Sequence, residues 1–123
     1  MTTSPDDNAP LIATEGDWTV LRFGPGMAQI VESNVEQARD YLMQGAEAAK
    51  QAPPPKLLLD LSGVGFFGSS FIEGLFRCWK AMQAADGEFA ISNCSEHCRE
   101  VLTVTHLADL WTIYGDNAEA TGA

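Results

Sequence analysis

The chain has 123 residues, of which 46% are hydrophobic and 20% are charged, and its formal net charge is −10. This size and composition are typical of one globular domain and leave no room for a second. The basic residues are scattered and form no stripe that could follow a phosphate backbone, which argues against direct nucleic-acid binding. They are Arg22, Arg39, Lys50, Lys56, Arg77, Lys80 and Arg99.

The amino-terminal sequence MTTSPDDNAP has neither the positive start nor the apolar stretch of a secretory signal. No apolar run approaches the length of a membrane span. The cysteines, Cys78, Cys94 and Cys98, are expected to be reduced in a chain without an export signal. We therefore expect a cytoplasmic protein with no membrane span.

Residues 1–15 are rich in Ser, Asp, Asn and Pro, which predicts a flexible amino-terminal tail. Residues 18–23 are predicted to form a strand because aromatic and β-branched residues dominate there. The Gly24-Pro25-Gly26 turn then predicts a reversal of the chain, and residues 27–31 an antiparallel partner strand. The first ordered unit is thus predicted to be a β-hairpin.

A helix is predicted to follow, because Ser33 and Glu36 have the spacing of a capping box. Apolar residues then recur three and four positions apart, as one helical face requires. They are Val35, Ala38, Leu42, Ala46 and Ala49. The prolines at 53–55 should end this helix near Ala52.

The stretch KLLLDLSGVGFFGSSFIE, from Lys56 to Glu73, predicts a buried strand, a loop of small residues and a second helix. Ser70 and Glu73 have capping-box spacing, so the helix is predicted to start at the serine. Its apolar arc is wider than packing on one sheet requires. This arc either faces a partner in part or is wrapped deeply by the domain. It consists of Phe71, Ile72, Leu75, Phe76, Cys78, Trp79 and Met82.

Asp86-Gly87 is a helix stop, and residues 88–92 predict another strand. Ser95 is the expected cap of a third helix, and residues 111–114 the last strand. Residues 117–123 are predicted to be a flexible end. The order ββαβαβαβ gives an α/β fold in which a mixed sheet of about five strands is covered by helices.

Binding loops are expected where the parallel strands end, which should bring Gly65–Ser70 next to Ser92 and Asn93. Ser69 and Ser70 would then lie at the start of the second helix. The positive end of the helix dipole tolerates a phosphate there, so phosphorylation should be felt mainly by a partner. The simpler alternative is that Ser70 only caps the helix and Ser69 is only a loop residue.

The sequence resembles the STAS domain of bacterial anti-anti-sigma factors, also called anti-sigma factor antagonists. The resemblance rests on Asp60-Leu61-Ser62, then Phe66-Phe67, then Gly68-Ser69-Ser70-Phe71, and continues without gaps from about residue 17 to 116. It is interpreted as placing the family's phosphorylated serine on Ser70, with Ser69 as the second choice. The chain departs from the family pattern at Gly68, usually aspartate, and Phe71, usually glycine, so partner choice is expected to differ.

The resemblance implies a STAS-like domain over residues 16–116, with the family's final helix short or absent. It implies an anti-sigma factor with serine-kinase activity as partner, which binds only the unmodified domain, and a serine phosphatase as a possible further partner. No cofactor is implied. The expected partner-binding residues are Gly65, Phe66, Phe67, Gly68, Ser69, Ser70, Phe71, Glu73, Gly74, Ser92 and Asn93.

Catalytic functions have little support in the sequence. Cys94, His97 and Cys98 are clustered, but a structural zinc site needs four ligands and His106 is more than two helical turns from His97. The run Gly68-Ser69-Ser70-Phe71-Ile72 lacks the second glycine of a hydrolase nucleophile elbow, and no nucleotide-binding glycine motif is present. We predict neither a catalytic residue nor a metal site.

Two other functions are compatible with the same fold. One is a STAS-like accessory subunit of a lipid-transporting ABC system, which would dock on an ATPase without being phosphorylated. The other is a non-phosphorylated scaffold of a larger signalling assembly. Both remain open alternatives to a phosphorylation switch.

Overall fold

The computed structural model describes residues 9–122. Residues 1–8 of the predicted tail therefore lie outside the described part of the chain. The described chain forms thirteen short and long elements in a mixed α/β order. They are β1 (Leu11–Glu15), β2 (Trp18–Arg22), η1 (Pro25–Met27), β3 (Gln29–Ile30), α1 (Val35–Lys50), β4 (Lys56–Asp60), β5 (Phe66–Phe67), α2 (Ser69–Ala84), β6 (Glu88–Ser92), α3 (Glu96–Val104), η2 (Leu107–Asp109), β7 (Thr112–Tyr114) and α4 (Asn117–Thr121).

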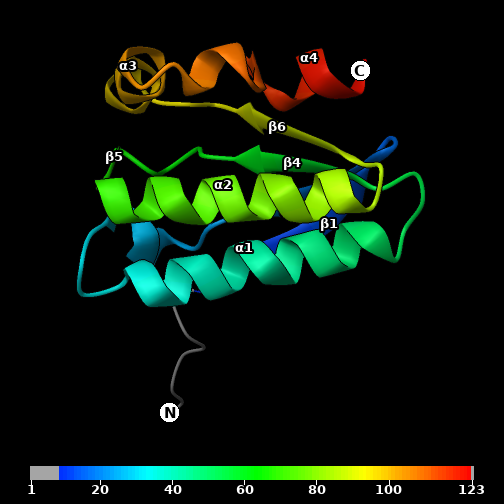
Figure 1. The fold of residues 1–123 in the computed structure, drawn as a ribbon, viewed down its shortest axis with the longest axis horizontal. Coiled ribbons are helices and arrows are strands. Elements are labelled where there is room, and N and C mark those ends of the chain that lie inside the picture. Colours follow the sequence, from blue (N-terminus) through cyan, green and yellow to red (C-terminus); the bar gives the residue numbers. More distant parts are fainter. Residues whose placement is uncertain (1–8, 123) are drawn as a thin grey trace.

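The main sheet has five strands in the order β1-β2-β4-β6-β7, which confirms the predicted mixed sheet. Strands β1 and β2 are antiparallel, whereas β2, β4, β6 and β7 run parallel. The helices between parallel strands cover the sheet, and α1 and α2 run side by side along it (Figure 1). No helix in this part of the chain is long and apolar enough to cross a bilayer.

The predicted first hairpin is wrong, because β2 pairs with a strand on its amino-terminal side. Residues 11–15, expected to belong to the tail, form β1 and pair antiparallel with β2, with Glu15 opposite Trp18. The turn is Gly16-Asp17, where Gly16 has a φ of +60° that glycine adopts without steric cost. A two-residue turn of this kind matches the twist of the strands that it joins.

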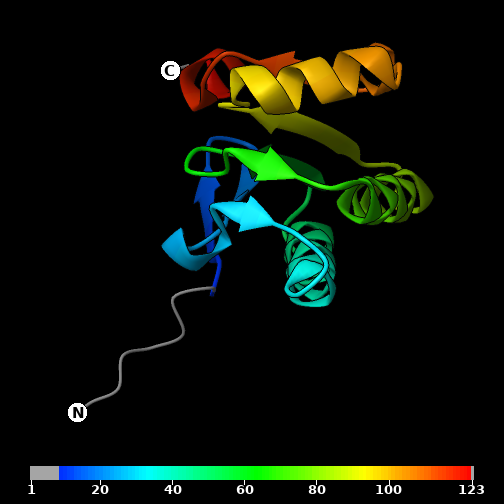
Figure 2. The same cartoon turned by 90° about the vertical axis from the view of Figure 1, so that its left-hand side faces the viewer.

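The segment after β2 forms a second, smaller sheet instead of the predicted hairpin partner. Gly24 is the cap of the short helix η1, which contains Pro25 and Gly26. Strand β3 then pairs parallel with β5, with Gln29 opposite Phe66 and Ile30 opposite Phe67. Met27 and Ile30 are fully buried, which anchors this segment to the core. Figure 2 shows β3 and β5 side by side at one end of the molecule, next to the start of α2.

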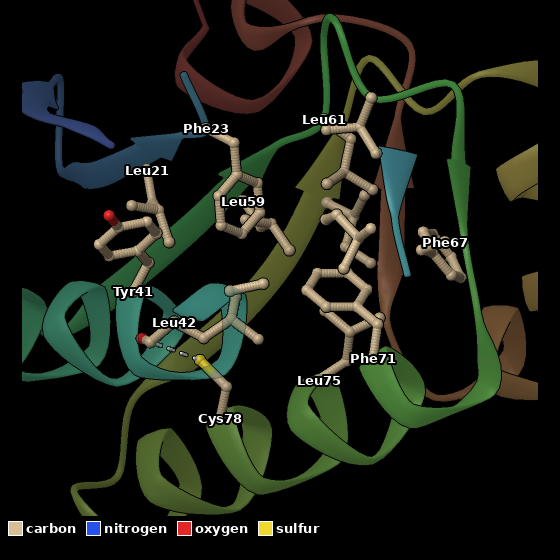
Figure 3. Close-up of a cluster of buried hydrophobic side chains, with 14 of the residues drawn as sticks. Leu21, Phe23, Tyr41, Leu42, Leu59, Leu61, Phe67, Phe71, Leu75 and Cys78 are labelled. Atoms are coloured by element: carbon tan, nitrogen blue, oxygen red, sulfur yellow. Dashed lines mark hydrogen bonds between the residues drawn. The ribbon is translucent and has the colours of Figure 1, made fainter. Parts of the chain in front are cut away.

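The main core lies between the sheet and the pair α1 and α2 (Figure 3). Phe71 and Leu75 of α2 pack with Leu42 of α1 and with Leu59 of β4. The two helices approach closely at Gly74, where a Cβ atom would lie only 2.7 Å from Cγ of Arg39. Burying these side chains positions the amino terminus of α2 against the end of β4.

Two of the three predicted helix caps are wrong. The cap residue of α1 is Asn34 rather than Ser33, and its Oδ1 accepts a hydrogen bond from Val31 N at 2.8 Å. The cap residue of α2 is Gly68, so the helix begins one residue before Ser70 and has no capping box. Ser95 does cap α3, and its hydroxyl accepts a hydrogen bond from Cys98 N at 3.1 Å.

The opposite face of the sheet carries a smaller apolar cluster, which consists of Trp18, Val20, Leu58 and Ala90. Tyr114 and Ala120 pack against this cluster, and Trp18 Nε1 donates a hydrogen bond to Ala120 O at 3.0 Å. Residues 117–121 were expected to be part of a flexible end, but they form the short helix α4, which these contacts hold against the sheet. Its cap is Asp116, whose Oδ1 accepts a hydrogen bond from Glu119 N at 2.9 Å.

Candidate partner-binding edge

The loop between β4 and α2 crosses the edge of the sheet where the parallel strands end. Backbone hydrogen bonds to the β3 segment fix it at two points. Gly65 N donates to Ala28 O at 2.9 Å, and Gly68 N donates to Ile30 O at 3.0 Å. This pairing presents the following residues, Ser69 and Ser70, at the surface in a defined position.

The two serines differ in their surroundings. Ser69 is the first residue of α2 and its side chain is exposed, whereas Ser70 is half-buried. The Ser70 hydroxyl donates a hydrogen bond to Glu32 Oε2 at 2.9 Å. Neither serine is sealed inside the molecule, so both are within reach of a docking protein.

The start of α2 is suited to an anion. No side chain caps this helix end, so its first backbone N–H groups are not used by a capping side chain. These donors and the helix dipole favour negative charge at this point. Glu32 and the exposed Glu73 lie nearby and oppose that effect.

An exposed aromatic pair borders the serines. Phe66 is 39% exposed, and its ring stacks on the exposed His97 of α3 with centroids 5.2 Å apart. Ser95 Oγ donates a hydrogen bond to Gly65 O at 3.4 Å, which ties the start of α3 to the same loop. The edge therefore combines a hydroxyl pair, an aromatic surface and the starts of two helices.

The predicted partner-binding residues divide by burial. Phe67, Phe71 and Ser92 are at most 2% exposed, and Gly74 is also buried. These four support the edge from below and offer no surface to a partner. The remaining seven are exposed or half-buried: Gly65, Phe66, Gly68, Ser69, Ser70, Glu73 and Asn93.

Asp60, at the end of β4, is a fully buried carboxylate beneath the start of this loop. It accepts hydrogen bonds from Arg22 at 3.0 Å and 2.8 Å and from Ser62 N at 2.9 Å. The amides of Asn93 and Asn117 donate to it at 3.1 Å and 3.0 Å. One side chain thus links β2, β4, the loop after β6 and α4.

Several opposing effects set the ionisation of Asp60. Burial raises its pKa, but hydrogen bonds from Ser62, Arg22 and Asn93 outweigh burial and hold the pKa below the ordinary value of 3.8. The carboxylate is therefore charged at neutral pH. Because its partners lie on several elements, this charge stabilises the arrangement of the edge.

Ser92 and Asn93 join the edge through this network rather than through the serine pair. Ser92 lies opposite Asp60 in the sheet, and its hydroxyl hydrogen-bonds to Asn117. Asn93 has a φ of +54°, a conformation that asparagine tolerates better than most residues. Its amide is thereby turned toward Asp60.

A shallow groove of about 130 Å³ lies between α1 and α2. Arg39 spans it with ion pairs to Glu36 at 3.6 Å and to Glu73 at 3.7 Å. Its lining residues are Glu36, Arg39, Asp40, Met43, Gly74 and Arg77. Glu73 therefore bridges the two helices instead of closing a capping box.

The cluster of Cys94, His97 and Cys98 does not converge on one point. His97 stacks on Phe66, whereas the buried Cys98 thiol donates to Val64 O at 3.8 Å. Within residues 9–122, no group of three or more His, Cys, Asp or Glu side chains is arranged to hold a metal ion.

Three contributors to the edge were not identified from the sequence. Asp60 had a local signal, since an acidic residue directly follows the three leucines of the strand. The sequence suggested His97 only as a possible metal ligand, although its place in the first turn of a helix at the same sheet edge predicts exposure there. Glu32 had no local signal, because it lies 38 residues from Ser70.

Comparison with protein families gives one match. The model of the STAS domain matches residues 13–120. The chain belongs to the STAS domain family. A search of curated proteins found no match. The match begins within β1 and ends within α4, so both elements that were expected to be flexible belong to the STAS domain.

Solved structures agree with this assignment. An anti-sigma-factor antagonist STAS domain protein from Planctomyces limnophilus is 37% identical, with 92% of this chain and 95% of that chain covered and a TM-score of 0.81. An anti-sigma factor antagonist from Mycobacterium paratuberculosis is 20% identical, with 97% and 95% covered and a TM-score of 0.74. The latter likeness concerns the fold.

A third structure is the anti-sigma factor antagonist SpoIIAA in its unphosphorylated form. It is 21% identical, with 77% of this chain and 82% of that chain covered and a TM-score of 0.54, and it too is similar in fold. Together with the 37% identity to the Planctomyces limnophilus domain, these findings show an STAS domain similar to that of anti-sigma factor antagonists.

Proposed function

We propose that this STAS domain binds an anti-sigma factor through the edge formed by the β4–α2 loop, the start of α2 and the start of α3. We further propose that phosphorylation of the serine pair releases the partner. In this role the domain is a binding protein, and the kinase activity belongs to the partner. The setting proposed for this exchange is the cytoplasm, with a serine phosphatase to reset the switch.

The observation that carries the proposal is the exposure of the serine pair at a helix start beside an aromatic surface. Phe66 offers apolar area for a partner, and Ser69 lies at the surface a few residues further on. Exposed aromatic side chains are frequent anchors in protein interfaces. The 37% identity to an anti-sigma-factor antagonist domain supports an anti-sigma factor as the partner.

Phosphorylation can act as a switch on electrostatic grounds. A phosphoserine adds about 1.5 to 2 negative charges. Burying that charge in an interface without a counter-charge costs several kcal/mol, and each ~1.4 kcal/mol lowers affinity tenfold.

Accessibility distinguishes the two acceptors. The resemblance placed the modification on Ser70, but the Ser70 hydroxyl is half-buried and donates to Glu32. A kinase must surround the hydroxyl that it modifies, and Ser69 is free to be surrounded in this way. Exposure therefore favours Ser69 as the acceptor, and the two positions need separate tests.

The test measures affinity for the purified anti-sigma factor by isothermal titration calorimetry. Ser69→Asp and Ser70→Asp are compared with Ser69→Ala and Ser70→Ala. The proposal expects at least one aspartate variant to bind at least tenfold more weakly than its alanine counterpart. Gln83→Asp adds the same charge at the exposed far end of α2 and should bind like wild type.

Equal binding by wild type and both aspartate variants would refute the switch. Intact-mass measurement after incubation with the partner and ATP identifies the acceptor independently. A phosphate on wild type that is lost in Ser69→Ala assigns Ser69, and loss in Ser70→Ala assigns Ser70. Full phosphorylation of the double variant Ser69→Ala/Ser70→Ala would exclude this serine pair as the site of modification.

A further inference from the structure

The hydrogen bond between Ser70 and Glu32 joins two segments that are 38 residues apart in the chain. Glu32 lies in the turn of residues 31–34, between β3 and α1. Asn34 closes this turn, because its Oδ1 accepts from Val31 N at 2.8 Å and its own N donates to Val31 O at 3.0 Å. The start of α2 is thereby connected to the start of α1.

This contact depends on the Ser70 hydroxyl being a donor. Glu32 is exposed, and among residues 9–122 no lysine or arginine forms an ion pair with it. The nearest cation along α1, Arg39, is engaged with Glu36 and Glu73. A phosphate on Ser70 therefore replaces a donor with an anion that faces an uncompensated carboxylate.

We infer that Glu32 is the positioning residue that couples charge on the serine pair to the turn of residues 31–34. In the unmodified chain, Ser70 holds Glu32 and the turn against α2. In the phosphorylated chain, repulsion between phosphate and carboxylate moves the turn away. The surface that a partner contacts then includes residues 31–34 as well as the loop before α2.

The inference rests on the proposed function, because it takes phosphorylation of the serine pair as its trigger. It adds the turn of residues 31–34 as a second surface, whose position depends on the charge of the serine pair. A phosphate on Ser69 has a weaker version of the same effect, since it leaves the Ser70 hydroxyl free to donate. The strength of the coupling should therefore depend on which serine carries the phosphate.

The coupling also predicts how the phosphate itself titrates. The second pKa of a phosphoserine is about 6. The groups around Ser70 are the carboxylate of Glu32 from the turn, Glu73 on α2 with its partner Arg39 from α1, and the backbone amides of the helix start. Glu32 raises the phosphate pKa, whereas the helix amides lower it equally in every variant.

The test uses the full chain with phosphoserine introduced at position 70 by genetic encoding, in otherwise wild-type and Glu32→Gln backgrounds. Phosphorus NMR titration gives the second pKa, and hydrogen exchange with mass spectrometry reports on residues 31–35. Glu100→Gln removes one exposed acidic side chain from α3 and is the matched control. Ser70→Ala removes the hydrogen bond without adding charge.

The inference expects Glu32→Gln to lower the phosphate pKa and to cancel the increase in exchange that phosphoserine causes at residues 31–35. Glu100→Gln should change neither. An unchanged pKa and unchanged exchange in Glu32→Gln would overturn it, as would equal exchange in Ser70→Ala and the phosphoserine chain. These measurements contain no partner, so a negative result overturns the coupling through Glu32 and leaves the proposed function intact. If the coupling is observed but phosphorylation does not change partner binding, only the proposed function is overturned.

Discussion

Replacing Asp60 with alanine should strongly destabilise the fold. The substitution removes the acceptor of five hydrogen bonds, two from Arg22 and one each from Ser62 N, Asn93 and Asn117. Arg22 loses the buried half of its ion pair. Arg22 is 44% exposed and stays hydrated, so the loss comes mainly from the Ser62, Asn93 and Asn117 donors left without an acceptor, which at about 1 kcal/mol or more each sum to roughly 3–5 kcal/mol. For a domain of this size, that loss corresponds to a melting temperature about 10–20 °C lower.

The measurement is urea unfolding followed by tryptophan fluorescence, with thermal unfolding by circular dichroism as a second probe. Asp40→Ala is the control, because Asp40 is exposed on α1, and surface substitutions usually change stability by less than about 0.5 kcal/mol. A loss below about 1 kcal/mol for Asp60→Ala would show that the network contributes little and would refute the reasoning, since even one unsatisfied buried donor costs about that much.

The same carboxylate predicts a dependence on pH. The pKa of Asp60 is lowered in the folded state, so its contribution to stability is complete above the ordinary value of 3.8 and is lost as the pH falls through the lower, folded value. Wild type should therefore lose more stability than Asp60→Asn between about pH 4 and pH 2. Parallel stability curves for the two proteins would contradict the assignment of a charged, stabilised carboxylate.

Close packing predicts the effect of one further substitution and the reactivity of one thiol. Gly87→Ala should destabilise the fold by about 1–3 kcal/mol, because its Cβ would lie 2.3 Å from Pro55 O. Gly65→Ala, whose Cβ would meet nothing closer than 4.0 Å, is the control, and equal denaturation midpoints for the two would be contrary evidence. Burial raises the pKa of Cys78 to about 12, so iodoacetamide at pH 8 should modify this thiol only after unfolding. Peptide mapping of the native and the urea-unfolded protein checks this, and rapid native labelling of Cys78 would disprove it.

Local sequence patterns predicted the elements that depend on local chemistry. The leucine run at 57–59 became the buried centre of β4, and Ser95 caps α3 as predicted. Strand β1 was missed because the polar residues before it suggested a tail. The signal was nevertheless present, since Gly16-Asp17 separates two β-prone runs by the two residues that a tight hairpin needs.

The candidate site was only partly predictable because tertiary contacts decide which side chains remain at the surface. Phe66 and Phe67 were predicted together, but alternation along β5 exposes the first and buries the second. Ser70 had the spacing of a capping residue, yet β3 brings Glu32 within hydrogen-bonding distance of its hydroxyl. No pattern within a few residues of Ser70 contains that information.

The central claim is that the edge around Phe66 and Ser69 is where an anti-sigma factor docks. Site-specific photo-crosslinking tests it most directly, with benzoylphenylalanine placed at Phe66 or, as control, at Gln83 on the exposed far end of α2. The account predicts that the anti-sigma factor is captured through position 66 and not through position 83. Capture through position 83 alone, or equally through both, would contradict it.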